Sequence, residues 1–405
     1  MYDSHPTMVH IEVTDKCNSE CAVCPRNIHG GAIHENIKNI QLGVEYFKLL
    51  GEEFICQIKQ WQFCGTRGDP MANTEIVEIV EYLRDVNRRN NVGDAFIIIR
   101  TNGGIGGVER FARLSELIGP MGFMCFSVDG LKDTNHIYRK NVKWDKIQAN
   151  MNTYLAGPGI MHWDFIVFKH NFHQLDEVKT FCKENNVHLE IKEPFGFEGG
   201  FGVTEGSRER AVYTMPVYDR RSGELLYEIE PETENEIPDF LHGHQPGRMG
   251  TKYHGAKVIR REFPKKQQIT SYRNEFAPMN YLAWYKNYVG QFDYNCEAID
   301  KNELFIDCDG QFLPCCFLAS AQFMEEPQIT DMLSKVDTSK HYPTETWTPK
   351  DILNSEFFVK TIPDGFEGKL DDEIGSCSTC VKMCGKEPTP TQEEITEALK
   401  WRLDH

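Results

Sequence analysis

Strand-like and helix-like segments alternate along the chain from about residue 8 to residue 193. Residues 8–13 alternate apolar and polar side chains, as a half-buried strand does, and residues 71–88 repeat apolar side chains with the helical period. Residues 95–100 form an apolar run of the length of a buried strand. Strict alternation implies a parallel sheet with right-handed crossovers. About six such units occur, so the pattern predicts an α/β fold, either a doubly wound sheet or an open partial barrel.

The alternation stops after Pro194. A hairpin is predicted over residues 212–230, with its turn at Arg221-Ser222-Gly223. An acidic stretch then runs to Asp239, and a basic one follows within residues 248–273. Two interpretations of these charges stay open: a solvated linker, or a segment that grips an anionic substrate.

The composition changes again from about residue 290. Residues 303–314 predict a tight β-hairpin with Asp309-Gly310 at its turn, and Thr391 with Glu394 predict the start of a last helix. We therefore divide the chain into a first domain over residues 1–195, an insert or linker over 196–285, and a C-terminal domain over 286–405.

The net charge of −17 argues against nonspecific binding along a long polyanion as the main task. Hydrophobic residues make up 40% of the chain and charged residues 26%, which is typical of globular proteins. No apolar stretch approaches the ~20 residues of a spanning helix, and the first residues lack a basic and apolar leader. The sequence therefore predicts a cytoplasmic protein without a membrane partner.

Fourteen cysteines stand out in a chain expected to be intracellular, where clustered cysteines indicate metal or redox ligands before disulfides. The spacing Cys17-x3-Cys21-x2-Cys24 directly follows the first predicted strand, at the edge where parallel α/β folds carry their chemistry. Three thiolates fit three corners of a [4Fe–4S] cluster and leave one iron open, whereas a structural zinc site requires four closed ligands. We interpret four solitary cysteines as small buried residues: Cys56, Cys64, Cys125 and Cys182.

Residues 17–26, Cys-Asn-Ser-Glu-Cys-Ala-Val-Cys-Pro-Arg, resemble the cluster loop of the radical S-adenosylmethionine (SAM) superfamily. Residues 64–70, Cys-Gly-Thr-Arg-Gly-Asp-Pro, look like its Gly-Gly-Glu-Pro motif, although an aspartate replaces the glutamate and Thr66-Arg67 is inserted between the glycines. Thr101-Asn102-Gly103 resembles the end of the family's third strand. Residues 126–130, Phe-Ser-Val-Asp-Gly, followed by Tyr138-Arg139, are similar to a segment that contacts SAM.

The resemblance covers roughly residues 8–195 and implies an open, TIM-like (β/α)6 partial barrel. It implies that Cys17, Cys21 and Cys24 hold the catalytic cluster. It further implies cofactor-binding roles at the positions that match the family's motifs. Backbone groups around Gly65, Gly68 and Asp69 hold the amino end of SAM, Ser127 and Arg139 approach its carboxylate, Asp129 binds the ribose hydroxyls, and Asn102 completes the set.

The C-terminal third resembles a SPASM/Twitch auxiliary-cluster domain, on the pattern Cys296, Gly310-x4-Cys315 and Cys377-x2-Cys380-x3-Cys384. This resemblance implies one auxiliary [4Fe–4S] cluster, for which we expect the ligands Cys296, Cys315, Cys377 and Cys380. Three further cysteines are reserve candidates: Cys308, Cys316 and Cys384. A zinc ribbon is the alternative.

The expected activity is reductive cleavage of SAM to a 5′-deoxyadenosyl radical, which abstracts hydrogen from a substrate. Dehydrogenation, cross-linking and epimerisation stay open, the last with Cys64 or Cys125 as a hydrogen donor. The expected substrate is a peptide or a small anionic or nucleotide-like metabolite, and the expected electron donor is a flavodoxin or ferredoxin. The alternatives are modification of a nucleic-acid base, for which the acidic charge is unfavourable, and a non-catalytic iron–sulfur or zinc protein.

Overall fold

The main sheet contains six parallel strands in chain order: β1 (Met8–Ile11), β2 (Gln60–Phe63), β3 (Phe96–Thr101), β4 (Gly122–Ser127), β5 (Ile160–Ile166) and β6 (His188–Lys192). The computed structural model describes residues 5–192, 194, 198–204, 207–232, 257–261, 296–366 and 380. Among these residues the strand order is linear with two ends, so the sheet is open rather than a closed barrel. The predicted α/β fold with an open parallel sheet is confirmed.

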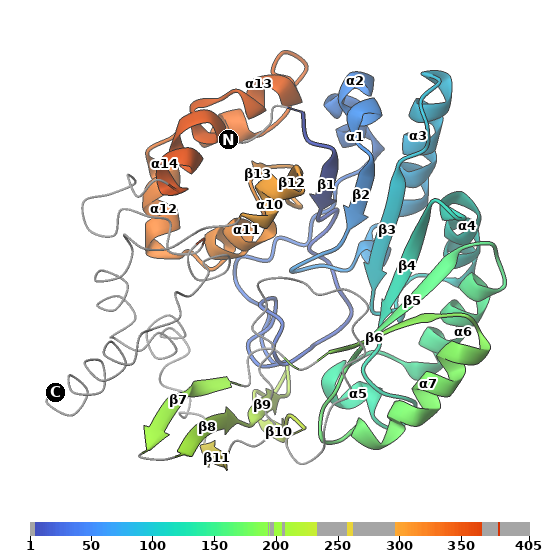
Figure 1. Ribbon diagram of the computed structural model, residues 1–405, viewed down its shortest axis with the longest axis vertical. Helices are drawn as coiled ribbons and strands as arrows, with labels where there is room; N and C mark the ends of the chain where they lie inside the picture. The colour runs from blue at the N-terminus through green and yellow to red at the C-terminus, as the bar shows by residue number, and fades with distance from the viewer. Residues whose placement is uncertain are drawn as a thin grey trace, which may run out of the picture.

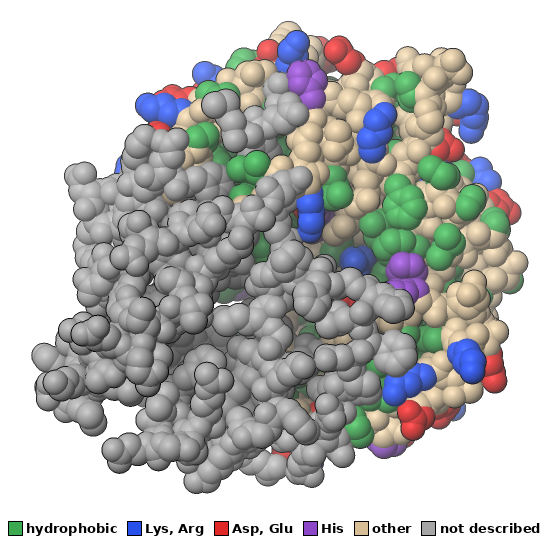
Figure 2. Space-filling view, viewed as in Figure 1, with side chains coloured by type: hydrophobic (Ala, Val, Ile, Leu, Met, Phe, Trp, Pro, Cys, Tyr) green, Lys and Arg blue, Asp and Glu red, His purple; other side chains and the backbone are tan. Residues whose placement is uncertain are grey.

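Helices cover one face of this sheet (Figure 1). They are α1 (Val44–Leu50), α2 (Glu52–Gln57), α3 (Ile76–Arg89), α4 (Val108–Ile118), α6 (Trp144–Leu155) and α7 (Leu175–Glu184). Short elements lie in the connecting loops: the 3₁₀ turns η1 (Pro70–Ala72) and η2 (Phe172–Gln174), and α5 (Asn135–Tyr138). Charged side chains of both signs are spread over the described outer surface (Figure 2).

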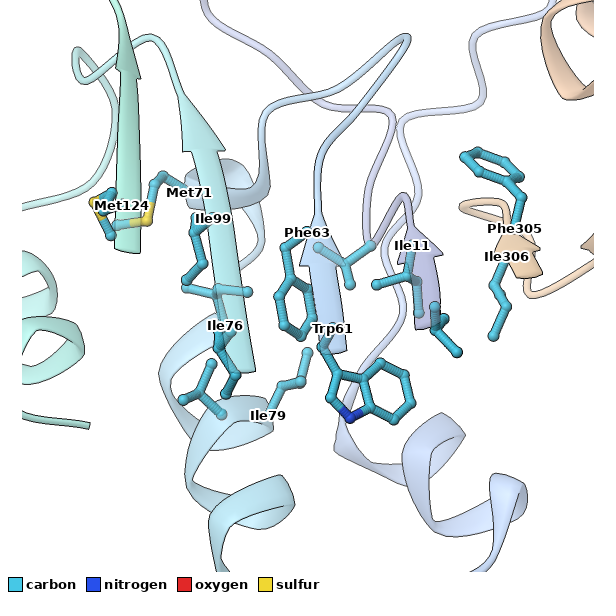
Figure 3. Packing of buried hydrophobic residues seen from close by; sticks show 14 of the residues in the cluster. Ile11, Trp61, Phe63, Met71, Ile76, Ile79, Ile99, Met124, Phe305 and Ile306 are labelled. Atoms are coloured by element: carbon cyan, nitrogen blue, oxygen red, sulfur yellow. The ribbon is translucent and has the colours of Figure 1, made fainter. Parts of the chain in front are cut away.

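The apolar core lies between the strands and these helices (Figure 3). Trp61 and Phe63 of β2 are fully buried there, together with Ile99 of β3, while Gln62 on the opposite face is half-buried. Successive side chains of a strand point to opposite faces of a sheet. The alternate positions of the strands therefore form a second, more polar face, which we call the inner face.

Two further strands extend the sheet beside β1. The predicted hairpin over residues 303–314 forms β12 (Glu303–Ile306) and β13 (Phe312–Leu313), and Gly310 at its turn has a φ of 87°. β12 pairs in parallel with β1 over four residues, so a segment far along the chain becomes part of the first sheet. The sequence predicted the hairpin but not this pairing.

The remaining C-terminal elements gather beside this hairpin (Figure 1). They are α10 (Glu297–Asp300), α11 (Cys316–Phe323), α12 (Pro327–Ser334), the 3₁₀ turn η5 (Thr338–His341), α13 (Pro349–Leu353), the π-helical turn η6 (Phe357–Thr361) and α14 (Ile362–Phe366). α11 and α13 contribute buried apolar side chains to the same core as the main sheet. The predicted last helix and its capping pair lie outside the described residues.

The middle of the chain contains two small sheets. The predicted hairpin around Gly223 is confirmed as antiparallel β9 (Met215–Tyr218) and β10 (Leu225–Ile229). A second sheet combines β7 (Glu198–Thr204), β8 (Ser207–Tyr213) and β11 (Lys257–Arg261), which the sequence did not predict. Of the basic stretch, only β11 lies within the described residues. The division of the chain into three segments stays a prediction.

No helix in the described part of the chain is long and apolar enough to span a membrane.

The docking of the C-terminal hairpin can be tested at Phe305, which is fully buried in β12 and packs edge-on against His10 of β1 at 4.9 Å between ring centroids. We expect Phe305→Ala to lower the free energy of unfolding by about 3–5 kcal/mol, because the cavity opens inside the shared core. Urea unfolding measures this. Leu49→Ala, at an exposed position of α1, is the control, and its change should stay within about 0.5 kcal/mol. Equal stability of the two variants would contradict the pairing of β12 with the sheet.

Candidate functional site

The loop after β1 brings Cys17, Cys21 and Cys24 together. The backbone N–H of Cys24 donates to the carbonyl of Cys21 at 3.2 Å. The thiols of Cys21 and Cys24 act electrostatically on that of Cys17, and Cys21 acts on Cys24. Burial raises the pKa of Cys17 and raises that of Cys24 to about 12. These thiols therefore stay protonated unless a cation stabilises their thiolates. Three soft sulfur donors in one short loop fit an iron–sulfur cluster with one open iron.

Polar groups from three segments face these sulfurs. The backbone N–H of Ser19 donates to Cys17 Sγ at 3.4 Å, and Asn102 Nδ2 lies 3.7 Å from the same atom. Arg139 Nη1 lies 3.8 Å from Cys21 Sγ. Donors and positive charge beside a sulfur stabilise its thiolate form and tune a cluster that it holds. Asn102 and Arg139, both predicted cofactor residues, thus lie against the cysteine loop.

Among the described residues, no group of three or more His, Cys, Asp or Glu side chains converges on a position for a single metal ion. A cubane cluster makes a different demand, because each cysteine ligates a separate iron. The absence of a single-ion site therefore does not bear on a cluster, for which the three thiols and the donors around them are the relevant groups.

The loop after β2 folds against the end of β1 through one buried carboxylate, Glu12. The backbone N–H groups of Arg67 and Gly68 donate to Glu12 Oε1 at 2.6 and 3.0 Å. Arg67 Nε donates to Glu12 Oε2 at 2.8 Å, and Thr66 Oγ1 donates to it at 3.2 Å. The inserted pair Thr66-Arg67 is thus held by Glu12 and does not disrupt the loop.

Two glycines are required in this loop for space. A Cβ on Gly65 would lie 2.1 Å from the carbonyl oxygen of Gly68, and a Cβ on Gly68 would lie 1.8 Å from the carbonyl oxygen of Thr14. Backbone neighbours at these distances cannot yield without moving the loop. Gly65 therefore lets the loop after β2 fold back on itself, and Gly68 lets its backbone contact that of the loop after β1.

Asp69 ties the loop after β2 to the end of β3. Its carboxylate, which is 4% exposed, accepts from Thr101 Oγ1 at 2.8 Å and from the N–H of Asn102 at 2.8 Å. It also accepts from the N–H of Met71 at 3.0 Å, where it caps η1. Burial raises the pKa of Asp69, and the hydrogen bonds oppose this shift. Asp69 thereby positions Asn102 beside Cys17, and its predicted contact with SAM stays a prediction.

Asp129 and Arg139 connect β4 to the cysteine loop. Asp129 is fully buried; its Oδ2 lies 2.6 Å from Arg139 Nε and its Oδ1 accepts from the N–H of Ile166 at 2.7 Å. Burial raises the pKa of Asp129, although the guanidinium of Arg139 opposes the shift. Ser127 lies half-buried two residues before it, with the same strand parity. The predicted residues Ser127, Asp129 and Arg139 are thus close in the fold, and their cofactor contacts stay predictions.

The auxiliary-cluster prediction is only partly within the described residues. Cys377 and the reserve candidate Cys384 lie outside them. Cys315, at the start of α11, interacts electrostatically with Cys296, and burial raises the pKa of Cys315. Cys380 is half-buried and packs against the main core. The predicted ligands Cys296 and Cys315 are therefore brought together.

The other reserve candidates, Cys308 and Cys316, have different surroundings. Cys308 is buried near the guanidinium of Arg67, and the side chain of Cys316 contacts His10 of β1. Among the solitary cysteines, Cys125 and Cys182 are buried as interpreted. Cys56 and Cys64 are half-buried.

Several site residues were missed from the sequence. Glu12 and Arg67 form a buried ion pair at 2.7 Å, and Arg67 Nη2 also lies 3.8 Å from Asp307 Oδ2 in the C-terminal hairpin. Asp15 shapes the loop after the cysteines by accepting from the N–H groups of residues 38–40. A glutamate directly after an apolar strand was the one available signal for Glu12, because a charged side chain at a buried position needs a partner.

No family model matches the sequence, and no curated protein matches it. Among solved structures, the chain is similar to SuiB of Streptococcus suis bound to S-adenosylmethionine, with 12% identity and a TM-score of 0.46 over 93% of this chain and 77% of that one. It is similar to anSMEcpe with bound AdoMet, with 13% identity and a TM-score of 0.47 over 98% and 92% of the two chains. HemN of Escherichia coli, a coproporphyrinogen III oxidase described as a radical SAM enzyme, matches 47% of this chain and 45% of its own, with 16% identity and a TM-score of 0.33. The structures similar to this chain thus include proteins that hold SAM and a radical SAM enzyme.

The role of Glu12 can be tested by Glu12→Gln. We expect the free energy of unfolding to fall by about 3–5 kcal/mol, because Arg67 would stay buried without its charged partner. Glu45→Gln is the matched control, since it breaks an exposed surface pair with Lys48 and should leave the free energy of unfolding almost unchanged. Urea unfolding of both variants beside the wild type measures the difference. If Glu12→Gln is no more harmful than Glu45→Gln, Glu12 does not hold the loop.

Proposed function

We propose that this protein is a radical SAM enzyme whose catalytic [4Fe–4S] cluster is held by Cys17, Cys21 and Cys24. The observation that carries the proposal is the set of three thiols in one loop, faced by Asn102 and Arg139 from the ends of two neighbouring βα units. The predicted cofactor residues of four different segments meet at this one edge of the sheet. A structural zinc loop has no need for such a convergence.

A [4Fe–4S] cluster held by Cys17, Cys21 and Cys24 would supply, when bound and reduced, the electron for cleavage of the C5′–S bond of SAM, which would give methionine and a 5′-deoxyadenosyl radical. The chain's own residues bind and orient the cofactor. Backbone groups around Gly65 and Gly68 hold its amino end, Ser127 and Arg139 its carboxylate, and Asp129 its ribose hydroxyls. The planar fork of Arg139 suits a carboxylate, and the buried Asp129 orients that fork. The inner face of the sheet then holds the substrate and excludes water.

We propose that Cys296, Cys315, Cys377 and Cys380 hold one auxiliary [4Fe–4S] cluster. Four thiolates fill such a cluster completely, and a cluster held there would supply a one-electron acceptor for oxidation of the substrate. The proposed outcome is net oxidation of the substrate, by dehydrogenation or cross-linking. Epimerisation is the alternative outcome, in which Cys64 or Cys125 returns a hydrogen atom.

We propose a peptide or a small anionic metabolite as the substrate. The similar structures include SuiB bound to its precursor peptide SuiA and anSMEcpe bound to the Cp18Cys peptide. Flavodoxin or ferredoxin is the proposed electron donor. The number of cysteines fits a reducing compartment, and we propose the cytoplasm.

The test is anaerobic reconstitution with iron and sulfide, followed by dithionite and SAM, with 5′-deoxyadenosine measured by chromatography. The wild type should form 5′-deoxyadenosine, and the Cys17→Ala/Cys21→Ala/Cys24→Ala variant should form none and lose about four irons. Cys56→Ala/Cys182→Ala is the matched control, because it removes thiols outside both proposed cluster sites. A Cys17/Cys21/Cys24 variant that keeps all its iron would overturn the proposal.

A further inference from the structure

Charged side chains line the inner face of β3, β5 and β6. Arg100 Nη1 of β3 and Lys192 Nζ of β6 both lie 2.7 Å from the same oxygen, Oδ2 of Asp164 on β5. Arg100 Nη1 also lies 3.4 Å from Cys125 Sγ on β4. Lys192 Nζ lies 3.2 Å from Oε2 of Glu190, which is one-third exposed. In the space-filling view a Lys or Arg side chain lies over this part of the sheet, beside a histidine and hydrophobic side chains (Figure 2).

Asp164 is fully engaged in this arrangement. Its side chain is 9% exposed, it pairs with two cations, and it accepts from the thiol of Cys125. Burial raises the pKa of Asp164, but the charges of Lys192 and Arg100 outweigh this and hold the pKa below its ordinary value. The ionised Asp164 therefore holds the two cations in place.

Arg100 is only partly engaged. All its hydrogen bonds to described residues use Nη1, so Nε and Nη2 are left as donors, and a quarter of the side chain is exposed. Lys192 is also about a quarter exposed. A guanidinium with one edge paired offers its other edge to a planar anion, and a neighbouring ammonium adds a second charge.

The position of this pair relative to the cysteine loop is set by the strands. Arg100 lies on β3, two residues before Asn102, which directly follows the strand and lies against Cys17. Two residues of a strand span about 7 Å. Arg100 therefore lies on the inner face, two residues along the strand from the edge where the cysteine loop, Asn102 and Asp129 meet. A group bound to Arg100 would be close to chemistry at that edge.

The charges of the inner face are not needed by the core, which is built from side chains of the opposite parity. Clusters of partly buried charged groups are concentrated at functional sites, and this one leaves donors of Arg100 unused. We propose that Arg100 and Lys192 bind a carboxylate of the substrate, with Asp164 as the residue that positions them. This inference rests on the proposed function, because it places the substrate on the inner face.

Two kinds of ligand could supply this carboxylate: a peptide with an acidic side chain, or a small carboxylic acid. Three probes distinguish these sources in saturation-transfer NMR titrations of the wild type: glutarate, acetyl-Ala-Glu-Ala-amide and acetyl-Ala-Gln-Ala-amide. We expect the glutamate peptide to bind about ten-fold more tightly than the glutamine peptide, because only the former brings a charge to Arg100. Tighter binding of the glutamate peptide than of glutarate indicates a peptide source, and the reverse order indicates a small acid.

Variants at Arg100 connect the binding to the site. Arg100→Gln should abolish the preference for glutamate over glutamine, and Arg100→Lys, which keeps the charge next to Asp164, should retain part of it. Arg88→Gln, on the opposite side of the sheet in α3, is the matched control and should retain all of it. Circular dichroism checks that the variants are folded.

Equal binding of the two peptides together with no binding of glutarate by the wild type would overturn the inference without any variant, as would full preference in Arg100→Gln. Neither result depends on SAM cleavage. The proposed function fails separately, if the reconstituted wild type forms no 5′-deoxyadenosine.

Discussion

The buried carboxylate of Glu12 organises the edge of the sheet where the chemistry is proposed. It follows β1, five residues before Cys17, and it accepts from the backbone of the loop after β2. Through Arg67 the same carboxylate is connected to Asp307 in the C-terminal hairpin. A fully buried charge is tolerated only with such a set of donors, so the three segments must assemble together. The cysteine loop, the loop after β2 and the C-terminal hairpin are thus parts of one unit.

The two faces of the sheet have different tasks. The face opposite the inner face packs large apolar side chains against the helices and supplies most of the stability. The inner face contains Arg100, Asp164 and Lys192, whose charges are matched to one another but leave donors unused. Where the strands end, Asp69 and Asp129 tie β3 and β4 to the cysteine loop through Asn102 and Arg139. Stability and chemistry therefore come from alternate residues of the same strands.

Local patterns predicted the six parallel strands, because apolar periodicity and a buried face determine each of them. The same holds for the turns at Gly223 and Gly310 and for the cysteine loop, whose spacing is itself the signal. The pairing of β12 with β1 was missed because it joins residues almost 300 positions apart and leaves no local pattern. The strands β7 and β8 were missed because glycine and charged residues have low strand propensity. The pair Glu12–Arg67 was missed because its partners lie 55 residues apart, and Arg67 was interpreted only as an insertion in a motif.

The proposed function requires that the loop with Cys17, Cys21 and Cys24 holds a cluster with an iron that is open to SAM. Electron paramagnetic resonance of the dithionite-reduced protein, recorded with and without SAM, is the decisive experiment. A Cys296→Ala/Cys315→Ala variant removes the signal of the proposed auxiliary cluster. We expect SAM to change the remaining signal, because the cofactor binds the iron that the three cysteines leave open. A cluster signal that SAM leaves unchanged would contradict the proposed function.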